Sequence, residues 1–161
     1  MLGTVKSILV NVGRLLVAAT FIFSGYVKAI DPLGTQYKIA DYLAAIHLAS
    51  VIPDWSILMA SVLLSTLEFS LGILLLFAIR RRLVSRLLLT VMVVMTLITV
   101  WIAVANPVKD CGCFGDAIKL TNMETLGKNV VLLAFTILLA CMPMHMPRLI
   151  SKQTQWIVIN Y

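Results

Sequence analysis

Four long apolar runs dominate the pattern of hydrophobic and polar positions along the chain. They cover residues 8–29, 55–79, 87–105 and 129–144, and an amphipathic approach from Thr121 lengthens the fourth and shortest run. A membrane's hydrocarbon core takes about 20 helical residues. Each run therefore predicts a transmembrane helix, and together they predict an all-α membrane protein built as a four-transmembrane-helix bundle.

The connections between these runs carry signals of their own. Residues 35–48 place Ile39, Leu43 and Ile46 near one helical face, which predicts an amphipathic segment in the outer interface between the first two spans. The short connection at residues 80–82 forces the second and third spans into an antiparallel hairpin. Thr121 and Glu124 have the spacing of a capping box, which predicts the start of the fourth helix.

Composition supports the membrane interpretation. The 161 residues are 61% hydrophobic and 12% charged, and the mean hydropathy is +1.02. These values lie far outside the range of soluble globular domains. We expect residues 1–150 to form the membrane domain and residues 151–161 to be a tail or the truncated start of a further segment.

Charge placement predicts the orientation, because Lys and Arg are retained on the cytoplasmic side. With both termini in the cytoplasm, the inner ends carry basic groups and no acid: Lys6, Arg14, Arg80, Arg81, Arg82, Arg86, Arg148 and Lys152. Every acid except Glu68 then lies outside. The net charge of +6 is thus a topology signal and gives no support to nucleic-acid binding. We expect a multi-pass protein of the bacterial inner membrane.

Two thiols separated by one glycine, Cys111 and Cys113, are the strongest chemical signal. They lie in the outer loop, facing the compartment in which disulfides persist. A disulfide closed over Gly112 would be strained, and strain favours an exchanging bridge. We therefore predict a redox-active dithiol. Two alternatives stay open: Cu(I) binding by the two thiolates, and a non-catalytic membrane scaffold whose loop is braced by a structural disulfide.

Ionisable residues inside the first two spans need partners. An ionised carboxylate such as Glu68 costs at least ~2.5–3.5 kcal/mol near a bilayer centre, so we expect it to pair with Arg14. The alternative is a proton-handling role beside a quinone or another substrate. Lys28 and Asp31, three residues apart, should meet on one helical face. We expect Cys141 to be a small buried apolar residue.

Several of these residues together resemble the MauE/DoxX family. The resemblance rests on Arg14, Phe23-Ser24-Gly25 with Lys28, Asp31-Pro32, Glu68, and the loop Asp110-Cys111-Gly112-Cys113-Phe114-Gly115-Asp116, and it covers roughly residues 5–145. It implies a four-helix, redox-associated membrane bundle linked to the maturation of disulfide-containing periplasmic proteins and to thioredoxin-like partners. Cys111 and Cys113 would then be the catalytic exchanging pair, with Arg14, Lys28, Asp31 and Glu68 as supporting residues.

The resemblance also bears on cofactors. Family bundles are compared with vitamin K epoxide reductase and with the disulfide-forming quinone reductases, which relay electrons through two cysteine pairs. This chain has one such pair. A thioredoxin-like periplasmic partner would therefore supply the second dithiol, and a quinone is the one cofactor that the comparison suggests. The sequence does not set the oligomeric state.

Overall fold

The structure, a computed structural model, describes residues 2–48, 51–105, 121–143 and 146 and is entirely helical over its regular elements there. The helices are α1 (Leu2–Ile30), α2 (Pro32–Ala45), α3 (Asp54–Leu76), α4 (Arg81–Ala105) and α5 (Asn122–Cys141). Four of them are long and apolar enough to cross a membrane, over Val5–Ile30, Asp54–Leu76, Arg81–Ala105 and Asn122–Cys141. The predicted all-α architecture with four spans is confirmed.

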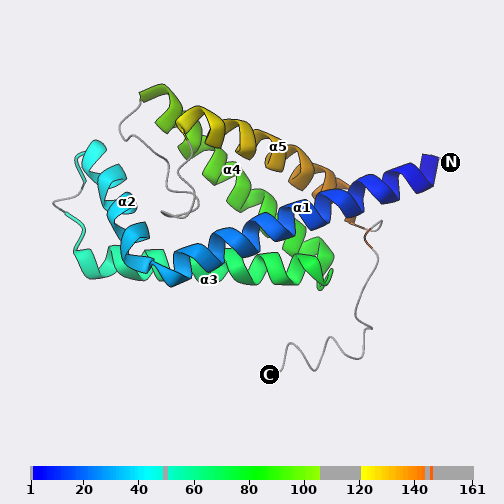
Figure 1. Cartoon of the computed structure of the whole chain (residues 1–161), viewed down its shortest axis with the longest axis horizontal. Helices are drawn as coiled ribbons and strands as arrows, with labels where there is room; N and C mark the ends of the chain where they lie inside the picture. The colour runs from blue at the N-terminus through cyan, green and yellow to red at the C-terminus, as the bar shows by residue number, and fades with distance from the viewer. Residues whose placement is uncertain (1, 49–50, 106–120, 144–145, 147–161) are drawn as a thin grey trace, which may run out of the picture.

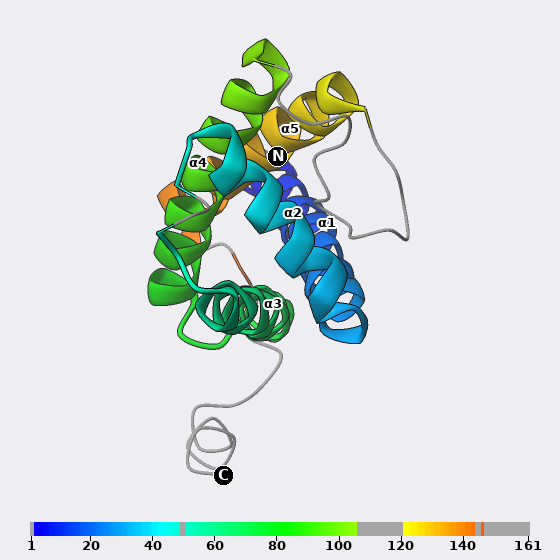
Figure 2. The same cartoon turned by 90° about the vertical axis from the view of Figure 1, so that its left-hand side faces the viewer.

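The four long helices form two closely packed pairs. Helix α1 packs most extensively against α3, and α4 against α5, while smaller α1–α5 and α3–α4 contacts join the pairs. The pairs diverge toward the end at which α1 stops and α5 begins (Figure 1). Helix α2 crosses in front of the other helices at this end, which we call the outer end (Figure 2), and packs against α3.

Local signals explain where the helices begin. The side chain of Asp31 caps α2 by accepting a hydrogen bond from the Gly34 amide, and Pro32 occupies the first turn, where its missing N–H costs nothing. The amphipathic helix therefore starts three residues earlier than predicted. At α5 the predicted capping box is present, with Thr121 and Glu124 bonding to each other's backbone amides.

Small residues let α1 and α3 approach until their backbones touch. A Cβ atom on Gly25 would lie 2.5 Å from the main-chain nitrogen of Phe69 and 2.8 Å from the main-chain oxygen of Ser65. A Cβ atom on Gly72 would lie 2.8 Å from the main-chain nitrogen of Ile22. These two glycines fix the register between the helices, because no side chain fits at either contact.

An apolar core fills the half of the bundle remote from α2. Val17, Leu75, Leu88 and Leu139 are at most 1% exposed there and pack in one cluster. On the outside, large apolar side chains are open, as expected where lipid replaces water as the solvent; Leu63 and Val104 are examples. This packing leaves the outer half of the interface between the two helix pairs for polar groups.

Candidate functional site: a buried ion pair beside a polar cavity

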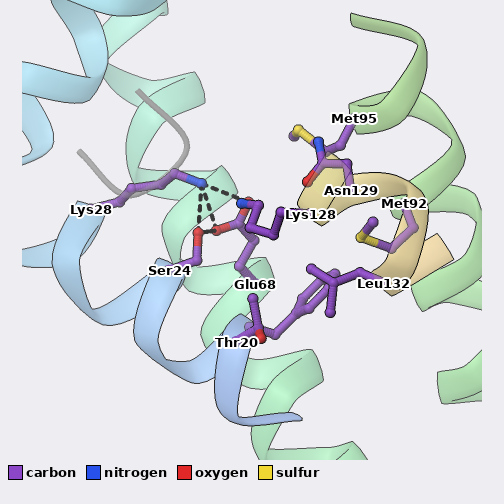
Figure 3. A pocket seen from close by; sticks show the side chains of 10 residues that line it. Thr20, Ser24, Lys28, Glu68, Met92, Met95, Lys128, Asn129 and Leu132 are labelled. Atoms are coloured by element: carbon purple, nitrogen blue, oxygen red, sulfur yellow. Dashed lines mark hydrogen bonds and ion pairs between the residues drawn. The ribbon is translucent and has the colours of Figure 1, made fainter. Parts of the chain in front are cut away.

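A closed set of charge-assisted hydrogen bonds joins α1 to α3. The ammonium of Lys28 lies 2.7 Å from Oε1 and 2.7 Å from Oε2 of Glu68, and it donates to the hydroxyl of Ser24 at 3.1 Å. Ser24 in turn donates to Oε2 of Glu68 at 2.8 Å. Figure 3 shows the three side chains converging between the helices. All three N–H donors of Lys28 are thereby used.

The ion pair is almost completely buried. The side chains of Lys28 and Glu68 are each 6% exposed. Removing two charges from water is expensive, and their attraction offsets the cost only when the remaining hydrogen-bonding groups are also satisfied. Ser24 meets this requirement, since it lies one helical turn before Lys28 and on the same face of α1. The Gly25 contact brings that face against α3.

The predicted partner of Glu68 was wrong. Within the described part of the chain, Glu68 bonds to Lys28 and Ser24 and not to Arg14. Arg14 precedes Ser24 by ten residues, which is about 15 Å of helical rise. Arg14 is buried in the inner half of the bundle. Glu68 lies opposite the last turns of α1 instead, because the contacts of Gly25 and Gly72 set the register between α1 and α3.

The predicted meeting of Lys28 with Asp31 was also wrong. Lys28 turns inward to Glu68, whereas the Asp31 carboxylate accepts the Gly34 amide at 2.8 Å and caps α2. The three-residue spacing would bring the two side chains together only if one helix continued through both. The chain instead leaves α1 after Ile30 and starts a new helix at Pro32.

Facing the ion pair, α4 and α5 carry a second set of polar side chains. The amide of Asn129 donates to the hydroxyl of Thr99 at 2.7 Å, and Thr99 donates to the main-chain oxygen of Met95 at 2.7 Å. Asn129 is 4% exposed and Thr99 is 1% exposed. The neighbouring residue on α5, Lys128, is half-buried. Two polar walls thus face each other across the interface between the helix pairs.

Between these walls lies a cavity of about 40 Å³. Ser24, Lys28 and Glu68 line one side, Lys128 and Asn129 the other (Figure 3). Phe21, Met92 and Leu132 also line it, and these three belong to the apolar core. Thr20, whose hydroxyl donates to the main-chain oxygen of Leu16, lines the same inner side. The cavity therefore has charged and amide groups toward the outer end and a mainly apolar floor toward the inner half.

Sequence reasoning missed the α5 side of this cavity. Asn122, Thr125 and Asn129 are spaced three and four residues apart and are all buried. This is the period of one helical face, and polar groups at that period in an apolar helix are a signal of a polar interface. This spacing is visible in the sequence, but the residues of α1 and α3 that face it across the cavity are not.

The cysteine pair was the strongest prediction from sequence, but Cys111 and Cys113 lie outside the described residues, as does the tail at 151–161. Residues 106–120 join the last residue of α4 to the cap of α5, both at the outer end. Cys141, expected to be buried, is exposed at the last position of α5. Among the described residues, no group of three or more His, Cys, Asp or Glu side chains could hold a metal ion.

Fold and site together define a multi-pass helical membrane protein with a buried ion pair and a polar cavity between two helix pairs. The chain matches the family model described as Methylamine utilisation protein MauE over residues 6–142, and it belongs to that family. No curated protein and no solved structure gives a significant match.

Proposed function

We propose that this protein is a redox component of the bacterial inner membrane whose Cys111/Cys113 pair exchanges thiols with a thioredoxin-like partner in the periplasm. Membership of the MauE family is the observation that carries the proposal. Two features support it. The segment with the two thiols starts and finishes at the outer end, and the basic inner ends favour an orientation that turns this end away from the cytoplasm.

The proposed reaction is thiol–disulfide exchange. One thiolate of the pair attacks a sulfur of the partner's disulfide, which forms a mixed disulfide and releases one partner thiolate. The second thiol of the pair, as its thiolate, then attacks the mixed disulfide. The pair leaves as a disulfide and the partner as a dithiol, so two electrons and two protons pass to the partner. The reverse reaction follows the same steps, and the two reduction potentials decide the direction.

The described residues contribute support to this reaction. Lys28, Ser24 and Glu68 hold α1 against α3, and Asp31 begins α2 at the outer end. The α4–α5 pair carries the thiol segment and is tied together below it by the Asn129–Thr99 bond. Helices that are held together at the two ends of the segment suit exchange, since the partner must approach along one defined line to the attacked sulfur.

Trapping the mixed disulfide tests the proposal. The background should be Cys141→Ser, because Cys141 is exposed and could form adducts of its own. In this background Cys113→Ser should accumulate a covalent adduct with a thioredoxin-like protein through Cys111, or Cys111→Ser through Cys113. The double variant is the matched control and should form none. Absence of an adduct from both single variants would overturn the exchange reaction.

The same variants separate the two alternatives. Copper that copurifies with the protein and is lost in Cys111→Ser would favour Cu(I) binding by the pair. Full activity of the host pathway with both cysteines replaced by serine would instead favour a scaffold whose disulfide braces the loop.

A further inference from the structure

We infer that the cavity between Glu68 and Asn129 is a hydrated site that water enters from the outer end, and that the bundle below it is dry. This inference concerns the described helices and goes beyond the proposed function, since it holds whether or not the cysteine pair exchanges thiols. The ligand is water itself, held at membrane depth between the two helix pairs.

Volume and polarity argue for water. A cavity needs roughly 10–15 Å³ to hold one water, so a cavity of about 40 Å³ has room for at least one, and a bound water needs two to four polar partners. The walls offer the carboxylate of Glu68 as an acceptor, the ammonium of Lys128 as a donor and the amide of Asn129. Empty cavities in proteins are apolar, whereas charged side chains form part of the lining of this one.

The ion pair gives a second, independent argument. The carboxylate of Glu68 accepts three hydrogen bonds, two from Lys28 and one from Ser24, whereas a carboxylate has about four acceptor positions. The carboxylate lines the cavity, so a water there can satisfy the remaining position. Ionisable groups within membrane spans are tolerated where they face a water-filled cavity or are paired, and Glu68 would have both.

The apolar floor makes the access one-sided. Phe21, Met92 and Leu132 close the cavity toward the inner half and are 5%, 3% and 3% exposed. The core cluster continues below them through Val17 and Leu75 to the inner end. On the other side the lining includes Lys128, which is only half-buried. Water therefore reaches Glu68 from the outer end and stops at the floor.

Radiolytic footprinting in ¹⁸O-labelled water tests this site, with the full chain in lipid nanodiscs. Hydroxyl radicals formed from water react only with adjacent side chains, and a methionine thioether takes up the oxygen as sulfoxide. Met92 lines the cavity although it is only 3% exposed. We expect Met92 to take up ¹⁸O at a rate approaching that of Met123, which is 68% exposed on α5.

A matched control places the same thioether in the dry core. Leu75 is 0% exposed and lies in the core cluster away from the cavity, and Leu→Met is a volume-conserving change. The Leu75→Met reporter should be labelled several-fold more slowly than Met92. Asn129→Leu, which removes a polar wall group, should lower the labelling of Met92 to the level of that reporter. Lys128→Met serves the same purpose if Asn129→Leu fails to fold.

Two results would overturn the inference. Labelling of Met92 no faster than that of the Leu75→Met reporter would mean that the cavity is dry. Equal and rapid labelling of both would mean that water penetrates the whole bundle and that the floor does not seal it. Neither result depends on adduct formation by Cys111 or Cys113, so failure here and failure of the proposed exchange are separable.

Discussion

The ammonium of Lys28 lies 2.7 Å from each carboxylate oxygen of Glu68, forty residues away in the sequence and on a different helix. Ser24 completes the set by bonding to both partners. This contact ties α1 to α3. It also gives the charged residue in each of these two spans a partner of opposite charge, which each needs because its side chain is only 6% exposed.

Removing one member of the ion pair should therefore destabilise the protein strongly. Lys28→Met leaves the Glu68 carboxylate buried without its cation, and breaking a buried pair in this way typically costs about 3–5 kcal/mol of unfolding free energy. Glu68→Gln should cost a similar amount. The double variant Lys28→Met/Glu68→Gln should be more stable than the sum of the single effects implies, because neither charge is left behind.

Reversible unfolding of the detergent-solubilised protein by SDS measures these free energies. Lys6→Met is the matched control, since Lys6 is an exposed lysine on the same helix and its loss should change the free energy little. Additive effects in the double variant would contradict a coupled pair.

The contact of Gly25 with α3 predicts a second stability difference. In Gly25→Ala the new methyl group would meet main-chain atoms of Phe69 and Ser65, which cannot rotate away, so α1 and α3 must separate. Overpacking of this kind costs about 1–3 kcal/mol. Gly127→Ala is the control, because nothing lies within 4 Å of its added Cβ atom. It should be neutral or stabilise by ~0.5–1 kcal/mol, the usual gain of Ala over Gly within a helix. The same unfolding assay checks both, and equal effects would contradict the close contact.

The cap of α2 should control the local order of that helix. Asp31→Ala removes the acceptor for the Gly34 amide, and loss of such a cap costs about 1 kcal/mol. Amide hydrogen exchange should accelerate in Pro32–Ala45 and remain unchanged in α4 and α5. Asp31→Asn retains an acceptor and should exchange like the parent protein. Asp41→Ala, an exposed acid within α2, provides the comparison for a change of charge alone. Unchanged exchange in Asp31→Ala would show that the cap does not limit opening of α2.

The orientation predicts opposite accessibility for the cysteines. Cys141 ends α5 at the inner end, whereas residues 106–120 connect helices at the outer end. A membrane-impermeant maleimide added to intact spheroplasts after mild reduction should label Cys111 and Cys113 in the Cys141→Ser variant. It should leave Cys141 unlabelled in the Cys111→Ser/Cys113→Ser variant until the membrane is permeabilised. The reverse pattern would invert the proposed topology and place the pair in the reducing compartment.

The local rules of sequence accounted for individual helices but not for contacts between them. The capping box at Thr121 and Glu124 was predicted correctly because both groups lie within one turn. The partner of Glu68 was predicted wrongly because Arg14 and Lys28 both lie on α1, and choosing between them requires the register of α1 against α3. Gly25 and Gly72 set this register, and which residues of the facing helix each glycine contacts is a property of the assembled pair.

The sequence by itself determined that this protein is an all-helical membrane protein with four spans, because about 20 apolar residues can satisfy their backbone in lipid only as a helix. It also placed the two thiols in one short connection between spans. The tertiary structure decided which charges meet and that Asn129 and Lys128 face Glu68 across a cavity. These relations depend on how far each helix slides and turns against its neighbours, and side chains from four different helices line the cavity that results.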